Sequence, residues 1–378
     1  MSLNVTSCHL KRCVSHFCIV AIGTLLPIVG YSQQPASTET TTTLKRESIP
    51  AAQAEQEKQA VERYHTREGR MQAKPLDWSS TIGKPRRVKR PPIRGKPATS
   101  QPGTPNPDAK REGQRLHPED WPNLKKPGGP QGGLDHKPRL VPVAFGSPDV
   151  FTQYCENCLV PNTDWPMVTI GKLFLNGGFC SASVISPNNV IVTAAHCCYD
   201  RNNMRFIGGW VFAPAYDNGN TPFGVFDWSS ATVLNSWINN GDIPSDVCTI
   251  KLANDQAGHG VSFYAGWLGR SWNFGSVQEH HALGYPQNLG GGNTLQLCTS
   301  ESFSPACGGP DILSTGCSMT FGSSGGPWIR SYRDPPGASN WVNSVVHGPS
   351  CQGTFGQTFN GARFTSGNIV PVCNAEGC

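Results

Sequence analysis

The chain has 378 residues, of which 37% are hydrophobic and 9% aromatic, enough to bury one large core or two modest ones. Its net charge of +5 is unevenly distributed: residues 1–140 contain 23 Lys and Arg against 12 Asp and Glu, whereas residues 141–378 contain eight against 14. This division excludes one uniform domain and indicates a basic segment joined to an acidic one.

Residues 1–32 have the features of a secretory signal peptide. Lys11 and Arg12 precede an apolar stretch from about Phe17 to Val29, and small residues follow it. A single membrane anchor is the less favoured alternative, because the stretch is shorter than the roughly 20 residues of a spanning helix. Twelve of the 15 cysteines follow residue 150, which also favours an exported, disulfide-bonded domain. We therefore expect a secreted protein, extracellular or periplasmic, without stable membrane insertion.

Residues 33–147 are rich in Thr, Pro, Gly, Lys and Arg, with one possible helix over residues 51–72. They contain too few apolar residues to offset the entropy of ordering, so we expect a largely disordered segment that does not fold by itself. It is either a propeptide removed on maturation or a basic tail that binds an anionic surface or polymer; a plain spacer is a third possibility. The propeptide is favoured because its positive charge faces an acidic downstream domain.

Residues 148–378 contain short apolar or alternating runs separated by Gly, Asn and Pro, such as WPMVTIGKLFL and WVNSVVHG. Such spacing is typical of many short strands and predicts an all-β sandwich or a pair of barrels. No amphipathic helical pattern of any length precedes the C-terminal end, which disfavours β-α-β folds. We therefore expect one all-β domain here.

The stretch GFCSASVISPNNVIVTAAHCC, residues 178–198, resembles the chymotrypsin-like (trypsin-like) serine proteases. In that family a Cys opens one strand, a turn follows, and the next strand ends in Thr-Ala-Ala-His-Cys. The resemblance covers about residues 160–370 and implies two packed six-stranded antiparallel β-barrels. It also implies that His196 is the general base and that Cys180 and Cys197 form the disulfide beside it.

The chemistry independently requires a carboxylate. A serine hydroxyl is a poor nucleophile until an imidazole takes its proton, and a carboxylate fixes the imidazole tautomer and stabilises its protonated form. Asp246, in PSDVCTIKLA, precedes an apolar run ending in Lys-Leu, much as the family's Asp does. Asp242 lies in a turn-forming context four residues earlier and is interpreted as a solvated loop acid.

The segment GSSGGP, Gly322–Pro327, matches the family's Gly-x-Ser-Gly-Gly-Pro motif and indicates Ser324 as the nucleophile. Glycine permits the tight backbone that lets the N–H groups of Gly322 and Ser324 converge on an oxyanion. The same letters satisfy the Gly-x-Ser-x-Gly turn of α/β-hydrolases. The order His196, Asp246, Ser324 is that of chymotrypsin, however, and excludes the hydrolase order of Ser, acid and His.

Two departures from trypsin concern activation and lineage. Trypsin and its close relatives have an Asp immediately before the nucleophile, which pairs with the new N-terminal ammonium, whereas this chain has Ser323. That ion pair cannot form, so any maturation follows another route. With LGYP at residues 283–286 and Trp328, the chain looks closer to the bacterial glutamyl-endopeptidase-like branch than to digestive trypsins.

Specificity is predicted from two substrate-binding positions. Ser318 stands where trypsins place the Asp at the base of the primary pocket, so a strong preference for Lys or Arg is not expected. His347, in SVVHGPSC, lies near the strand that lines one pocket wall, where glutamyl endopeptidases use a histidine to receive a substrate carboxylate. The alternative for His347 is a solvent-facing residue at a strand end.

Cysteine connectivity does not follow from the sequence alone. A bridge between Cys317 and Cys351 would reproduce the family's disulfide beside the primary pocket, and Cys298 is the rival partner for Cys317. Two further pairs, Cys155 with Cys158 and Cys373 with Cys378, are candidates for local loops. The spacings do not form two complementary Cys-x-x-Cys clusters with His, so no metal site is expected.

The sequence thus predicts a secreted serine endopeptidase that hydrolyses protein or peptide substrates through a Ser-His-Asp triad and an acyl-enzyme. No cofactor, nucleic-acid partner or stable membrane insertion is expected, and the enzyme is expected to be a monomer. The alternative is a catalytically inactive chymotrypsin fold that serves as a binding or adhesion protein. The complete triad argues against that alternative.

Overall fold

The computed structural model describes residues 39–84, 92–105, 150–158, 163–306, 309, 311–332, 340–350 and 356–378. The predicted signal peptide and Cys351 lie outside these residues. Among the helices in the described ranges, none combines the length and the apolar composition needed to cross a membrane.

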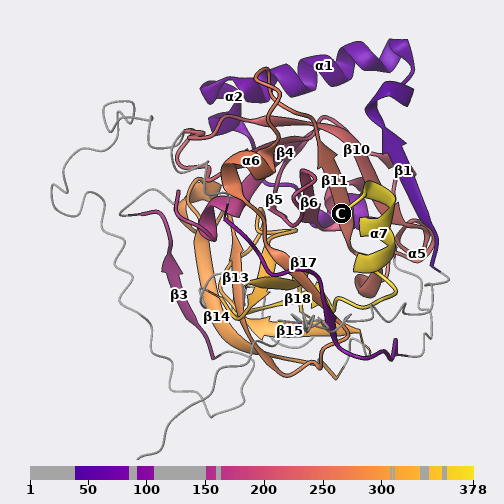
Figure 1. The fold of residues 1–378 in the computed structure, drawn as a ribbon, viewed down its shortest axis with the longest axis vertical. Helices are drawn as coiled ribbons and strands as arrows, with labels where there is room; N and C mark the ends of the chain where they lie inside the picture. The colour runs from indigo at the N-terminus through magenta and orange to yellow at the C-terminus, as the bar shows by residue number, and fades with distance from the viewer. Residues whose placement is uncertain are drawn as a thin grey trace, which may run out of the picture. The chain divides into compact units, whose positions relative to one another are not determined.

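The first barrel is a closed ring of six antiparallel strands (Figure 1). The order around it is β10-β11-β6-β5-β4-β9, and pairing of β9 with β10 closes the ring, with Phe212 opposite Phe226. The strands are β4 (Ile170–Leu175), β5 (Gly178–Val184), β6 (Val190–Thr193), β9 (Val211–Pro214), β10 (Phe226–Leu234) and β11 (Cys248–Leu252).

The second barrel is also a closed ring of six antiparallel strands, in the order β16-β13-β14-β15-β18-β17 with pairing of β16 and β17 closing it. The predicted pair of six-stranded barrels is therefore confirmed. The strands are β13 (Gln278–Gly284), β14 (Gln296–Phe303), β15 (Ile312–Gly316), β16 (Pro327–Arg330), β17 (Trp341–Pro349) and β18 (Thr358–Ala362).

Shorter elements decorate the barrels. Strand β3 pairs with β14, β12 with β17 and β2 with β12, while β7 and β8 form a small hairpin. These elements are β2 (Ala98–Thr99), β3 (Thr152–Cys155), β7 (Tyr199–Asp200), β8 (Arg205–Phe206), β12 (Gly269–Trp272), α5 (Asn235–Asn240), α6 (Val261–Ala265) and α7 (Ile369–Glu376). The short 3-10 turns are η1 (Arg46–Ser48), η3 (Met167–Thr169), η4 (Ala195–Cys197), η5 (Ile243–Ser245) and η6 (Gly290–Gly292).

Strands β4 and β5 are rich in apolar residues because both of their faces are covered. Every residue of β4 and β5 is buried. Trp210 and Trp228 meet edge to face in the core, with ring centroids 4.8 Å apart, and both are fully buried. Burial of such large side chains is the main favourable term in the stability of this core.

The described parts of the basic segment are ordered through contacts with the barrels. Strand β1 (Thr41–Lys45) pairs antiparallel with residues 230–234 of β10. The helix predicted over residues 51–72 is present but interrupted: α1 (Ala51–His65) ends before Thr66, whose side chain caps α2 (Arg67–Gln72) by accepting from the Gly69 N–H. A third helix, α3 (Trp78–Ile82), follows.

The described parts of this segment, residues 39–84 and 92–105, build no core of their own, in line with their composition. Their buried apolar side chains join the core of the barrels instead: Val61, Tyr64, Leu76 and Ile82. Figure 1 shows α1 lying along the first barrel near β4, and the Tyr64 ring stacks on Phe174 of β4 at 4.8 Å. The described residues accordingly belong to one compact unit.

Candidate active site

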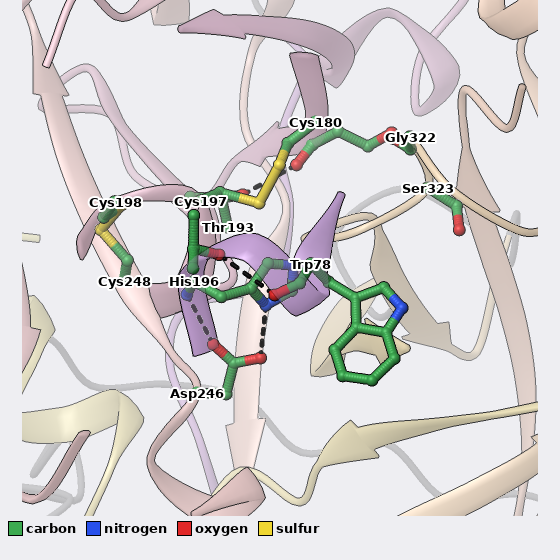
Figure 2. The surroundings of a disulfide bond; sticks show 12 residues. Trp78, Cys180, Thr193, His196, Cys197, Cys198, Asp246, Cys248, Gly322 and Ser323 are labelled. Carbon is green, nitrogen blue, oxygen red and sulfur yellow. Dashed lines mark hydrogen bonds and ion pairs between the residues drawn. A yellow bond between two sulfur atoms is a disulfide. The ribbon is translucent and has the colours of Figure 1, made fainter. Parts of the chain in front are cut away.

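His196 lies in η4, the turn that follows β6, and its side chain is fully buried. Two disulfides hold this turn. Cys197 is bonded to Cys180 of β5, and Cys198 is bonded to Cys248 of β11 (Figure 2). The turn is therefore tied to strands on both sides, which fixes the position of the imidazole.

Asp246 lies between η5 and β11 and is also fully buried. Its Oδ1 accepts the backbone N–H of His196 at 2.8 Å, and its Oδ2 lies 2.8 Å from Nδ1 of the His196 ring (Figure 2). Because a carboxylate accepts hydrogen bonds, Nδ1 carries the proton and Nε2 is the basic nitrogen. Asp242, by contrast, accepts a hydrogen bond from Ser245 within its own turn.

His347 of β17 is the second imidazole at this carboxylate. Its Nδ1 lies 2.5 Å from Oδ2 of Asp246, and its ring stands perpendicular to that of His196 at 5.7 Å. The side chain is 7% exposed, so the solvent-facing alternative for His347 is wrong. This contact could not be foreseen from the sequence, because the two residues are 101 positions apart.

The charge of Asp246 is stabilised by both histidines. Burial alone would raise the pKa of the carboxyl, but attraction to His196 and hydrogen bonds from His196 and His347 outweigh burial. The pKa of Asp246 is consequently held well below its usual range. Asp246 is thus an ionised acceptor at neutral pH and keeps both imidazoles in a fixed orientation.

Ser324 lies in the tight loop before β16 and is 4% exposed. Gly322 and Gly325 on either side adopt φ of 92° and 78°. A Cβ on Gly322 would collide with the Tyr285 carbonyl and the Phe179 ring, and one on Gly325 would collide with Thr193. Both positions therefore require glycine, as the motif predicts.

Ser181, which the sequence analysis did not single out, fastens this loop to the first barrel. Its N–H donates to the Ser324 carbonyl at 2.8 Å, and its hydroxyl donates to the Gly322 carbonyl at 2.9 Å. Ser181 also follows Cys180, whose disulfide reaches Cys197 beside His196. The serine loop and the histidine turn are thus attached to neighbouring residues of β5.

Nε2 of His196 has no hydrogen-bond partner in the part of the chain that the structure describes, although it is buried. A buried imidazole nitrogen without a partner is costly unless it serves a purpose, and a proton acceptor for a nearby hydroxyl is such a purpose. Ser323 cannot provide that hydroxyl, because its Oγ donates to the Thr320 carbonyl at 2.7 Å.

Ser318, the predicted pocket residue, follows β15 and is partly exposed. Its carbonyl accepts a hydrogen bond from the Asn288 side chain at 2.8 Å. The preceding Cys317 is bonded to Cys298, not to Cys351. The preferred pairing of Cys317 with Cys351 is therefore wrong, because adjacent strands β14 and β15 bring the Cα atoms of Cys298 and Cys317 within 5.5 Å.

Two other predicted disulfides, Cys155–Cys158 and Cys373–Cys378, are present as local loops. The donor atoms of His196, Asp246 and His347 lie within 4.8 Å of one another, as metal ligands can. Both Nδ1 atoms already face the Asp246 carboxylate. We therefore interpret the cluster as a hydrogen-bond network.

Residues 161–355, just over half of the chain, match the family model for trypsin. The chain belongs to the trypsin family of serine proteases. The chymotrypsin-like resemblance is confirmed, and the protein is a serine-type endopeptidase. Its placement near the glutamyl-endopeptidase-like branch of the family stays a prediction.

Several solved proteases are similar to this trypsin-family chain, each with a TM-score of 0.49. A thermostable serine protease, AL20, from an extremophilic microorganism is 29% identical, over 56% of this chain and 98% of that one. Protease Anisep from Arthrobacter nicotinovorans is 25% identical, over 57% and 97%. A Glu endopeptidase in complex with MPD is 16% identical, over 60% and 97%. Among curated proteins, none matches the chain.

Proposed function

We propose that this trypsin-family protease is secreted and cleaves protein substrates with Ser324 as nucleophile, His196 as general base and Asp246 as the carboxylate that orients His196. The observation that carries the proposal is the His196–Asp246 pair, buried and hydrogen-bonded through Nδ1 at 2.8 Å, with Nε2 left without a partner among the described groups. This is the arrangement in which an imidazole can take a proton from a serine hydroxyl.

The proposed reaction has two stages. In the first, Oγ of Ser324 attacks the peptide carbonyl carbon while Nε2 of His196 takes the hydroxyl proton. The N–H groups of Gly322 and Ser324 stabilise the oxyanion, and its collapse breaks the C–N bond as Nε2 gives the proton to the leaving amine. In the second stage, water attacks the acyl-enzyme with Nε2 as base and releases the acid and the free Ser324.

Secretion is supported by disulfide chemistry. Five disulfides lie among the described residues, and such bonds persist in oxidising compartments. In this proposal residues 1–32 are the signal peptide, residues 33–147 the propeptide and residues 148–378 the mature protease. The dibasic pairs at residues 86–87 and 110–111 are candidate processing points.

The first test is labelling by a fluorophosphonate probe, together with peptide hydrolysis, in Ser324→Ala and the matched control Ser323→Ala. Ser324→Ala loses the nucleophile, so we expect no labelling and a fall in turnover on the order of a millionfold. Ser323→Ala loses only the hydrogen bond to Thr320 and keeps labelling. If the processed wild type is neither labelled by the probe nor able to cleave casein, the proposed activity is wrong and the protein is a catalytically inactive binding or adhesion protein.

A further inference from the structure

We propose that residues 74–82 of the N-terminal segment are a built-in inhibitor that occupies the substrate cleft over Ser324 and His196. This inference rests on the proposed function, because it names what regulates the same site. The interaction surface extends from Phe179 on one side of His196 to His347 on the other. Residues 74–82 of the same chain occupy it.

On one side, the segment takes the free backbone groups of Phe179. The Leu76 N–H donates to the Phe179 carbonyl at 2.9 Å, and the Phe179 N–H donates to the Lys74 carbonyl at 2.9 Å. This forms a parallel bridge between Pro75 and Phe179. Phe179 directly precedes Cys180, and its ring lies where a side chain at Gly322 would be. An extended substrate binds by adding to such an open strand edge, which here is already paired.

On the other side, Trp78 covers the His347 end of the site. Its indole lies 6.2 Å from the His347 ring. A Cβ at Gly348 would touch the same indole at 3.7 Å. Asp77 caps α3 by accepting from the Ser79 N–H at 2.9 Å, which fixes the helix at Trp78. Figure 2 shows Trp78 beside the His196–Asp246 pair.

The loop after His196 anchors the segment at its far end. Helix α3 packs on η4, the turn that carries His196. The Arg201 N–H donates to the Thr81 carbonyl at 2.8 Å, and the Asn202 side chain donates to the Ser80 carbonyl at 2.6 Å. The Arg201 guanidinium also contacts the Ile82 carbonyl. Three successive carbonyls of α3 are thus held by two residues beside the catalytic turn.

The residues of the site are closed off beside this segment: His196 is 0% exposed and Ser324 4%. Nε1 of Trp78 and Nε2 of His196 are both buried without a partner among the described atoms. A substrate has to displace residues 74–82 before its carbonyl can reach Ser324.

The test compares the rate of fluorophosphonate labelling in the full-length wild type, Trp78→Ala and Asn202→Ala. Trp78 and Asn202 are not fully buried, so the variants are expected to fold. Hydrogen exchange of residues 74–82 and Phe179 reports release of the segment independently of activity. We expect both variants to lose this protection and to label at least tenfold faster, by population of the open state. The control Gln72→Ala, an exposed site in α2, should match the wild type.

Two outcomes separate the proposals. If hydrogen exchange shows residues 74–82 released in Trp78→Ala while labelling is as fast in the wild type, the segment is not an inhibitor and the proposed function stands. If the released variants do not label at all, the proposed function fails and the inhibition fails with it.

Discussion

The Asp246 carboxylate is hydrogen-bonded by two imidazoles, which makes the stability of the fold sensitive to acid. Its pKa in the folded protein lies below the value of 3.8 expected when it is exposed, so ionised Asp246 stabilises the fold above about pH 4. That stabilisation is lost as the pH falls further and the carboxyl is protonated. We expect the free energy of unfolding to fall more steeply below pH 4 in the wild type than in Asp246→Asn. Denaturant unfolding at pH 2 to 6 measures both slopes, and parallel slopes would contradict the assignment.

His347 is the residue for which activity and specificity can be separated. From the sequence we predict that His347 tilts selection towards Glu at P1 and that Ser318 leaves no counter-charge for Lys or Arg. A buried charge-assisted hydrogen bond to the P1 side chain changes the ratio of kcat/KM between substrates by a large factor. We expect kcat/KM for matched peptides to show no dominant Arg preference, and His347→Ala to lower the ratio of Glu to Ala.

Because His347 also bonds Asp246, His347→Ala should reduce kcat for every P1 residue. His347→Gln is the control, because the amide can still donate to Asp246. A dominant Arg preference would contradict the interpretation of Ser318. An unchanged ratio of Glu to Ala in His347→Ala would contradict that of His347.

Lys172 is a buried lysine on β4. It is 1% exposed, and its Nζ lies 3.8 Å from the centre of the Phe179 ring. Burial lowers the pKa of Lys172 to about 7, against 10.5 when exposed. The unfolded chain therefore binds more protons between these values, and stability should rise with pH from about 7 to 10.5. Lys172→Met should flatten this rise in thermal unfolding; an equal slope in both proteins would refute it.

At the scale of elements, two disulfides hold the histidine turn between strands. The Cys198–Cys248 bond closes a loop with a sequence separation of 50 and ends two residues after Asp246. Replacing both cysteines by Ala should destabilise the fold by about 2–4 kcal/mol and lower kcat, because η4 and β11 separate. The control is the Cys155–Cys158 bond at the end of β3, with a sequence separation of 3. Equal effects of the two replacements on kcat would contradict this role.

The elements also show how far the sequence could predict the fold. Alternating runs and the motifs around His196, Asp246 and Ser324 predicted the barrels and the local elements that carry these residues. The bond from His347 to Asp246 and the pairing of Phe179 with residues 74–76 join distant parts of the chain. Local periodicity specifies which residues face inwards but not which distant partner they meet. The predicted pairing of Cys317 with Cys351 was wrong for the same reason, because the sequence does not specify which distant cysteine lies beside Cys317.

At the scale of the whole molecule, maturation should change stability as well as activity. We expect intact-mass analysis of culture supernatant to show an active species without residues 33–147. Removal of residues 33–147 takes four buried side chains out of the core: Val61, Tyr64, Leu76 and Ile82. The processed enzyme should therefore unfold at a lower temperature than the full-length chain. An active full-length species would favour the basic-tail alternative, and equal unfolding temperatures would contradict the role of the segment in the core.

The pairing of β1 with β10 also sets an order for biosynthesis. Residues 41–45 are synthesised long before residues 230–234, yet each set supplies the hydrogen-bond partners of the other. Contacts so distant in sequence form slowly, and exposed strand edges invite association between chains. Strand β1 can therefore pair with β10 only after about two thirds of the polypeptide has left the ribosome. If processing removes β1, residues 230–234 of β10 lose these hydrogen-bond partners and become an open strand edge, the kind of edge that can pair with another chain.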